Sequence, residues 1–281
     1  MAINDQTEFS LRYHDGTKHP GGYLMDRFHA FDSAQQPLMH KGYLGVDTVP
    51  LSLSKQRLYA PALEAIATVG TPYGTPAHPR VEDVSTTLHL SAGITRRITR
   101  NWGEYTFRAA ACTGALYHIE LYIVCGDLPG LEAGVYHYDV AESRLDRLRD
   151  GDFRGDLADV CGGRRSVAEA PFSIVYTDVV WRNAVKYQAR EYRHAFWDSG
   201  TMVANTLAVC NGLGMAAEVV VGFVDDAVSH LIGADGEREF PVAVVPVGAG
   251  SAVPQPLIGH TLAIETDAED HPTVPAVTRM H

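Results

Sequence analysis

The chain has 281 residues, 46% of them hydrophobic, which is enough for one large domain, or two at most, with a real core. Because 34 acidic residues outnumber 23 basic ones, the formal charge of -11 argues against nucleic acid as a partner. The four cysteines form no CxxC pair and the thirteen histidines no HExxH motif, so we expect neither a disulfide framework nor a metal site. The N-terminus lacks a basic stretch followed by an apolar run, and no later apolar run reaches about 18 residues. We therefore expect a cytoplasmic protein without a membrane segment.

Residues 1–80 are expected to form an N-terminal arm and a first helix packed on the core. Within them, the glycine-rich stretch YHDGTKHPGG (13–22) predicts an ordered loop or arm. Apolar residues that share one helical face predict a helix over 59–69. A second helix is expected over 81–92, because Gly93 can end it.

From residue 119 onward the pattern changes to short runs rich in β-branched and aromatic residues. These runs predict five strands, over 119–125, 134–140, 172–180, 217–223 and 240–248. Helical patterns separate several of them, over 153–160, 182–211 and 225–233. The alternation predicts a layered structure of helices and strands in which the apolar runs are central strands. We therefore expect a main domain over 81–250 and a proline-rich tail over 251–281, forming a single domain overall.

The stretch WRNAVKYQAREYRHAFWDSG (181–200) is strongly basic and is followed by an almost wholly apolar segment. It is either a solvated helix face or the rim of a cavity that holds phosphate or carboxylate groups. Lys186 beside Tyr187 adds a chemical option, since a nearby ammonium group favours the phenolate form of a tyrosine, which can act as a base. Adjacent helical residues diverge by about 100 degrees, so the two side chains would have to converge on a ligand.

A second unusual stretch is FRAAACTGALYHIELYIV (107–124), which predicts a tight turn of small residues leading into a strand. Small residues let backbone N–H groups approach a ligand closely, and Arg108 is positioned to take a phosphate. Small residues also simply pack, so the turn alone does not identify a site. Cys112 in this turn is either a small packed residue or a reactive thiol.

Together these stretches resemble a known family. ACTGALYHIELYIV is similar to the PSGGALYPLELYVV-type segment of SagB-type dehydrogenases, the thiazole/oxazole-forming enzymes of the FMN-dependent nitroreductase superfamily. KYQAREYRHAFWDSGTMVANTLAVCNGLGMAA resembles the KYGxRxYRYxLLDAGHxAQNLxLxAxxLGLGA segment. The segment VVVGFVDDAVSHLIGADGEREFPVAVVPVG resembles the last conserved segment of the family pattern. The segment YHDGTKHP resembles the family's N-terminal YHExTKH segment. The four segments follow the family's order between residues 11 and 249.

The resemblance implies an α+β, nitroreductase-like fold: a mixed β-sheet surrounded by helices, with a long central helix at the interface of a homodimer that binds FMN. It also implies an activity, the oxidation of a thiazoline or oxazoline, or a related bond, in a peptide or natural-product intermediate. The reaction combines proton abstraction with hydride transfer to the flavin. A cyclodehydratase is the partner that such chemistry implies, alongside a peptide or small-molecule substrate.

By the same resemblance, Lys186 and Tyr187 are the catalytic pair, with Tyr187 as the base and Lys186 stabilising its phenolate. The residues expected to bind the cofactor are Arg108, Cys112, Thr113, Gly114, Arg193, Val221 and Gly222. The family's arginine-serine cluster is absent from AIATVGTPYG (65–74), so the candidates for the FMN phosphate are Arg96, Arg97, Arg108 and Arg193. Two alternatives are an NAD(P)H-dependent FMN oxidoreductase of the nitroreductase type and a non-catalytic scaffold subunit of a biosynthetic complex.

Overall fold

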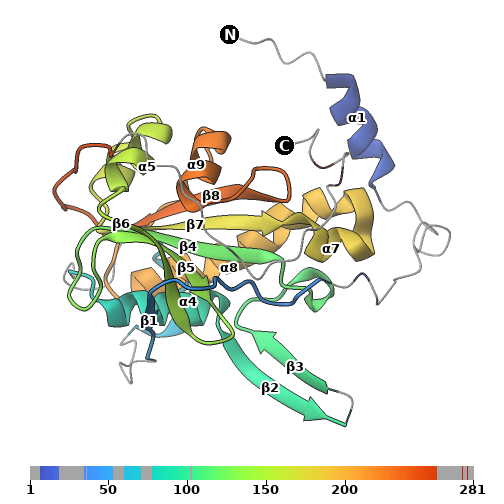
Figure 1. Cartoon of the computed structure of the whole chain (residues 1–281), viewed down its shortest axis with the longest axis horizontal. Helices are drawn as coiled ribbons and strands as arrows, with labels where there is room; N and C mark the ends of the chain where they lie inside the picture. Colours follow the sequence, from blue (N-terminus) through green and yellow to red (C-terminus); the bar gives the residue numbers. More distant parts are fainter. Residues whose placement is uncertain are drawn as a thin grey trace.

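The computed structural model describes residues 7–18, 35, 37–52, 60–70, 78–101, 103–257, 274 and 277. A six-stranded sheet with the order β1-β6-β5-β4-β7-β8 forms its centre, and the hairpin β2-β3 projects from the body (Figure 1). The strands are β1 (Thr48–Pro50), β2 (Ile94–Arg100), β3 (Gly103–Arg108), β4 (Ile119–Cys125), β5 (Gly134–Asp139), β6 (Arg144–Asp150), β7 (Phe172–Val179) and β8 (Glu239–Val247).

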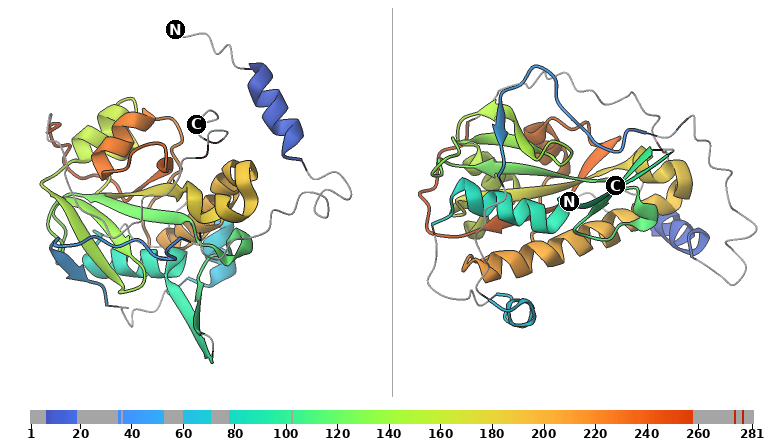
Figure 2. Two further views of the ribbon diagram at one scale, coloured as in Figure 1. Left: turned by 45° about the vertical axis from the view of Figure 1, so that its right-hand side comes forward. Right: turned by 90° about the horizontal axis from the view of Figure 1, so that it is seen from below.

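Helices cover both faces of this sheet. They are α1 (Thr7–Gly16), α3 (Ala62–Ala67), α4 (Val81–Ala92), α5 (Arg154–Val160), α6 (Arg165–Ala168), α7 (Val180–Tyr187), α8 (Glu191–Gly212) and α9 (Asp225–Ile232), with the 3-10 turns η2 (Thr113–Ala115) and η3 (Gln188–Arg190). Figure 2 shows α8 running along one face beside α4, while α5 and α9 lie on the other. None of the described helices is both long and apolar enough to cross a membrane.

The strands of the main sheet are buried because side chains pack against both of its faces. Every residue of β4, β5 and β8 is buried. On one face Leu88 and Met202 belong to the core that α4 and α8 complete. On the other face Leu157 and Val228 belong to the core under α5 and α9. The α+β class is confirmed, but every strand pair of the main sheet in the described residues is antiparallel, which differs from the expected mixed sheet.

Most predicted elements are confirmed. The structure has strands at four of the five predicted positions, a helix over 81–92 that ends before Gly93, and helices within 153–160 and 225–233. The strand predicted over 217–223 is wrong. Only Ala217 and Val220 form isolated bridges to β8, and Val221 is 73% exposed, so this apolar run lies at the edge of the sheet as an irregular segment.

The N-terminal part differs from expectation. α1 includes the first residues of the stretch 13–22, which was expected to be a loop; residues 19–22 lie outside the described part of the chain. The helix predicted over 59–69 is the shorter α3, which buries Ala65 and leaves Leu63 83% exposed. Its apolar face therefore points away from the core of this chain.

The long helix predicted over 182–211 is interrupted. α7 ends at Tyr187, and Gln188 adopts a left-handed conformation with φ 49° before α8 begins. A non-glycine residue in this region is uncommon and cannot continue a right-handed helix. The interruption separates the Lys186–Tyr187 pair from the long helix and lets the two segments take different directions.

Candidate functional site

The turn that precedes β4 and the end of α7 meet at one place. Gly114 has φ 66°, and a Cβ atom there would lie 2.8 Å from the Tyr187 hydroxyl oxygen and 3.3 Å from Lys186 Nζ. Ala115 and Tyr117 also have positive φ angles, so the turn is tight. The structure therefore brings the expected turn residues and the Lys186–Tyr187 pair together.

The Lys186 and Tyr187 side chains are half-buried and lie close to each other. Lys186 Nζ is 5.3 Å from the centroid of the Tyr187 ring. The ring of His194 packs edge-on against Tyr187, with centroids 4.7 Å apart. In a continuous helix, His194 would lie seven residues beyond Tyr187, a distance of about 10.5 Å along the axis. The interruption after Tyr187 therefore permits the contact between the two rings. Burial lowers the pKa of His194 to about 4, so His194 is neutral at physiological pH.

The turn is held from α8 by one carboxylate, Asp198. Its Oδ2 atom accepts from the Thr113 backbone N–H at 2.7 Å and from Cys112 Sγ at 3.1 Å. Its Oδ1 atom accepts from Thr113 Oγ1 at 2.9 Å. Cys112 Sγ itself accepts from the Tyr117 backbone N–H at 3.1 Å. Asp198 thus fixes both side chains at the start of the turn, a role that its place in the predicted helix did not indicate.

Behind Asp198 lies a buried group of ionisable side chains. His118 Nε2 contacts Asp198 Oδ2 at 2.8 Å, and His118 Nδ1 contacts Asp178. Glu191 Oε1 lies 3.8 Å from His118 Nδ1. Burial would lower the pKa of His118, but Asp178 and Asp198 outweigh it and raise the pKa well above 6.5. Burial and the charge of Asp178 raise the pKa of Glu191 well above 4.5.

These groups include two sets of atoms close enough to bind a metal ion. They are Cys112 with His118 and Asp198, and His118 with Asp178 and Glu191. Histidine nitrogen and carboxylate oxygen are common ligands of zinc and other first-row metals. Sequence motifs did not indicate either set, because His118, Asp178 and Glu191 are far apart along the chain.

Two arginines expected to bind the cofactor have other contacts. Arg108 is buried and its guanidinium group donates to the carbonyl oxygens of Ile119 at 3.4 Å and Met39 at 3.5 Å. Arg193 donates to Thr17 Oγ1 and to the carbonyl oxygen of His14, both at 2.8 Å, and so holds the end of α1. Within one chain, Arg108 points into the protein body and Arg193 acts as a clamp for α1.

Val221 and Gly222 lie apart from the turn within one chain. They follow Val220, which bridges to Val244 in β8. The end of β8 nearest the turn is marked by Phe240, which pairs with Asp178. Val244 lies four residues beyond Phe240 in β8, which is a distance of about 13 Å along the strand. Both residues are exposed, so a shared site with the turn would need a second copy of the chain.

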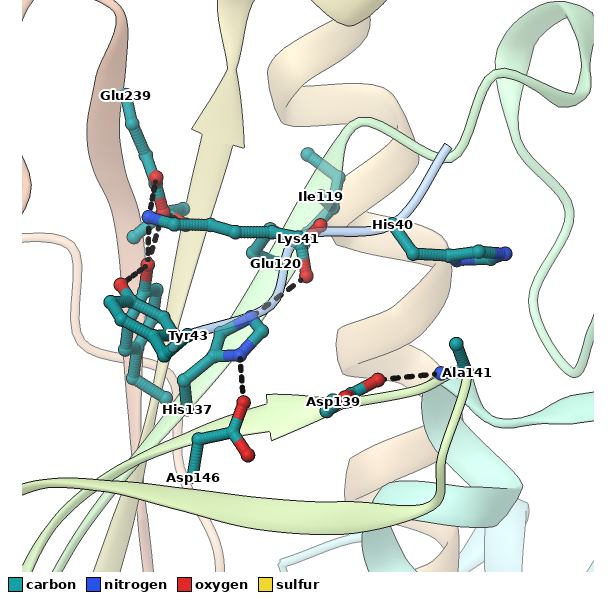
Figure 3. A network of polar contacts seen from close by, with 12 residues as sticks. His40, Lys41, Tyr43, Ile119, Glu120, His137, Asp139, Ala141, Asp146 and Glu239 are labelled. Atoms are coloured by element: carbon teal, nitrogen blue, oxygen red, sulfur yellow. Dashed lines mark hydrogen bonds and ion pairs between the residues drawn. The ribbon is translucent and has the colours of Figure 1, made fainter. Parts of the chain in front are cut away.

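A second buried polar group lies beside β4 (Figure 3). Lys41 Nζ donates to Glu239 Oε2 at 2.6 Å and to the Tyr122 hydroxyl at 2.8 Å. Glu120 accepts from Arg182 and contacts His137 Nε2 at 3.2 Å. Each buried glutamate here has a lysine or arginine partner.

Comparison with known proteins agrees with this architecture. The model of the nitroreductase family matches residues 83–249, more than half of the chain. The protein MJ1384 of Methanocaldococcus jannaschii is 24% identical over 168 residues, which cover 60% of this chain and 80% of MJ1384. The microcin B17-processing protein McbC of Escherichia coli is 27% identical over 136 residues, covering 47% of this chain and 50% of McbC. The trifolitoxin-processing protein TfxB of Rhizobium leguminosarum bv. trifolii is 33% identical over 119 residues, covering 40% of this chain and 32% of TfxB.

Solved structures show the same fold. A nitroreductase-family structure from Anabaena variabilis has a TM-score of 0.72 at 23% identity, covering 97% of this chain and 53% of that chain. The E. coli microcin synthetase McbBCD complex with truncated pro-MccB17 bound has a TM-score of 0.53 at 20% identity, covering 82% of both chains. This chain therefore spans about half of the Anabaena chain and of McbC, and about a third of TfxB. The expected resemblance to the nitroreductase superfamily is confirmed, and the chain belongs to the nitroreductase family of oxidoreductases.

Proposed function

We propose that the protein is an FMN-dependent oxidoreductase of the SagB type, which oxidises a thiazoline or oxazoline, or a related bond, in a peptide or natural-product intermediate. The observation that carries the proposal is the contact of the Lys186–Tyr187 pair with Gly114 in an exposed turn of small residues. The similarity to the processing proteins McbC and TfxB supports the substrate class.

The turn suits the flat ring system of a flavin. Gly114 and Ala115 are exposed and carry no side chain larger than a methyl group, so a ring can approach the backbone closely. The ammonium group of Lys186 lies next to them and can face the carbonyl groups of such a ring. We propose that Cys112, Thr113 and Gly114 contact the isoalloxazine from one chain and Val221 and Gly222 from its partner.

The phosphate group needs a cation, and the arginines differ in their availability. Arg108 is buried, Arg193 holds α1, and Arg97 pairs with Glu104 at 2.8 Å. Arg96 is exposed on the β2-β3 hairpin, and its side chain makes no hydrogen bond or ion pair within the described part of the chain. Arg96 is therefore the phosphate ligand that we propose first, with Arg193 second.

When bound, FMN supplies the hydride acceptor. The chain's own part is to move a proton and to orient the reactants. Tyr187 would accept the proton of the azoline ring, and the position of its hydroxyl oxygen beside Gly114 in the exposed turn supports this role. Lys186, whose Nζ atom lies 5.3 Å from the centroid of the Tyr187 ring, would stabilise negative charge that develops during the reaction, and the ring of His194 packs edge-on against Tyr187 and orients it. Removal of such a base costs about a hundredfold to ten-thousandfold in rate.

A homodimer and a cyclodehydratase partner complete the proposal. Phe196 and Trp197 are exposed large hydrophobic residues on α8, which is unusual for a helix that otherwise packs on the core. We propose that this face meets a second copy of the chain. A microcin synthetase complex among the structural relatives supports a larger assembly with the enzyme that forms the azoline.

The test begins with the absorbance spectrum of the purified protein before and after addition of FMN. We expect a flavin spectrum, and a colourless protein that takes up no FMN would rule out the proposal. The next step is conversion of an azoline peptide, followed by mass spectrometry as the loss of two hydrogen atoms per ring. Rapid bleaching of the flavin by NAD(P)H, without azoline oxidation, would instead support the reductase alternative.

Variants then assign the roles within the pair. Tyr187→Phe and Lys186→Ala should each reduce azoline oxidation by about a hundredfold or more while FMN stays bound. Tyr105→Phe is the matched control, since Tyr105 is an exposed tyrosine on β3 away from the pair. Full activity in both Tyr187→Phe and Lys186→Ala would remove the catalytic roles from these residues.

A further inference from the structure

Two buried carboxyl groups from different elements face the imidazole ring of His118. Asp178 lies at the end of β7 and Glu191 begins α8, and the side chains of all three residues are 0% exposed. Both carboxyl oxygens of Glu191 and the Oδ2 atom of Asp178 have no hydrogen-bond partner within the described part of the chain. Buried polar atoms are nearly always paired, so three unpaired oxygens in one place indicate a ligand that the side chains do not supply.

The charges of this group do not balance through side chains alone. Within the described residues, the ion pairs of Asp178, Glu191 and Asp198 are all with His118. Even a protonated imidazole supplies a single positive charge for three carboxylates. Buried carboxylates without a cation cost so much free energy that they are paired, bind a metal ion or take up a proton. A divalent cation would balance Asp178 and Glu191, while Asp198 accepts from the Thr113 N–H and hydroxyl groups at 2.7 and 2.9 Å.

The donor atoms are close enough to share a metal ion. A nitrogen of His118 and an oxygen each of Asp178 and Glu191 lie within 4.8 Å of one another, and Glu191 Oε1 is 3.8 Å from His118 Nδ1. Zinc holds histidine nitrogen and carboxylate oxygen at about 2.0–2.2 Å, so two of its donors lie at most about 4.4 Å apart. Small side-chain rotations are therefore sufficient to close this set around an ion.

His118 is also oriented as a metal-binding histidine. Its Nε2 atom lies 2.8 Å from Asp198 Oδ2, and its Nδ1 atom contacts Asp178. Metal-binding histidines usually donate their other ring N–H to a carboxylate, which fixes the ring. With the proton on Nε2, the lone pair of Nδ1 faces carboxylate oxygens, an arrangement that a cation between them stabilises. The other candidate set, which includes Cys112, has no unpaired carboxyl oxygen, because Asp198 already accepts from the turn.

We propose that His118 Nδ1, Asp178 and Glu191 bind a divalent first-row metal ion, with zinc as the first candidate. Imidazole nitrogen together with carboxylate oxygen suits zinc and its neighbours, and both oxygens of Glu191 can take part. None of the three ligands is exposed, so a substrate cannot reach the ion and the site is structural. The inference goes beyond the proposed function and does not depend on flavin binding.

The ligands lie on both sides of the segment that carries the proposed catalytic pair. Asp178 lies just before α7, and Glu191 comes directly after η3. A metal ion bound to both would fix one end of this segment on the sheet and the other on α8. Through His118 it would also orient Asp198, which holds the turn before β4.

The first test is the metal content of the purified, tag-free chain, measured by inductively coupled plasma mass spectrometry. We expect about one zinc, or another first-row divalent ion, per chain. Because the site is closed, EDTA should remove the ion only when the chain is unfolded in urea and refolded, and the urea midpoint should then fall until Zn²⁺ is added. Wild type without bound metal, both as purified and after refolding with Zn²⁺, Mn²⁺ or Co²⁺, overturns the proposal. Metal that the folded chain loses to EDTA also overturns it.

Variants then locate the ion. Asp178→Asn/Glu191→Gln keeps the size of both side chains but removes both anionic donors, so the metal content should fall at least about tenfold. Glu237→Gln, an exposed change, should keep the metal, and so should Cys112→Ser, which alters only the other candidate set. Full metal content in the double variant, or its loss in Cys112→Ser, overturns the proposal. Wild type and Cys112→Ser decide the question even if the double variant does not fold.

Metal binding and flavin binding can fail independently of each other. A chain that holds the metal ion but takes up no FMN supports the metal site and rejects the proposed function. A chain that binds FMN and oxidises an azoline peptide without any bound metal supports the proposed function and overturns the metal site.

Discussion

Glu239 and Glu191 are both buried acids near the same end of the sheet, but they have different partners. Glu239 meets the ammonium group of Lys41 at 2.6 Å, whereas Glu191, within the described part of the chain, lies beside His118 and other acids. Glu120 resembles Glu239, because Arg182 lies against it. A buried carboxylate with its own cation is held by that cation and links the elements that carry the two groups. Glu191 has no such cation among the described residues, and both of its carboxyl oxygens are buried without a hydrogen-bond partner there.

The largest effect on stability is expected when Lys41 loses its charge. Lys41→Met leaves Glu239 buried without a cation, so we expect the free energy of unfolding to fall by about 3–5 kcal/mol in chemical denaturation. The double variant Lys41→Met/Glu239→Gln should recover much of this loss, since no charge is then left unpaired. A loss below about 1 kcal/mol in the single variant would show that the pair contributes little.

Acid should weaken the ion pair of Glu120 with Arg182. Burial would raise the pKa of Glu120, but Arg182 and His137 outweigh it and hold the pKa far below 4.5. The stabilisation by Glu120 is therefore present above pH 4.5 and is lost as the pH falls. We expect wild type to lose more than about 1.4 kcal/mol of stability between pH 5 and 2 through this group, and Glu120→Gln to show a shallower acid slope. Equal slopes in both proteins would contradict this assignment.

The smallest expected effect concerns one hydrogen bond between Asp198 and the turn. Thr113→Val removes the hydroxyl that donates to Asp198 Oδ1 but keeps the backbone N–H that donates to Oδ2. We expect a loss of about 1 kcal/mol in the free energy of unfolding, measured in urea. Thr99→Val on the exposed side of β2 is the control and should change stability by less than about 0.5 kcal/mol.

The predicted fold was most reliable where burial alone determines the pattern. β4, β7 and β8 are apolar because side chains pack on both faces of the sheet, so their sequences indicate strands directly. β6 was missed because its sequence, RLDRLRD, is mostly charged. One of its arginines has distant partners: Arg149 donates to the carbonyl oxygens of Leu231 at 2.8 Å and His230 at 2.7 Å. A local pattern contains no information about such contacts.

The candidate site was also predicted only in part. The resemblance assigned Lys186 and Tyr187 to catalysis and Gly114 to cofactor binding, and the structure brings the three residues together. The buried contacts of His118 with Asp178 and Asp198 were not predicted, because Asp178 lies 60 residues and Asp198 80 residues from His118. The interruption at Gln188 was also missed, since nothing in the helical pattern of that stretch indicates a left-handed residue.

The turn has one practical consequence for anyone who handles this protein. Of the four cysteines, Cys125, Cys161 and Cys210 are buried and Cys112 is partly exposed. A maleimide dye or a nitroxide should therefore attach at one position without any engineered cysteine, directly beside the catalytic pair that we propose. The native chain thus has a built-in position for a spectroscopic reporter of ligand arrival.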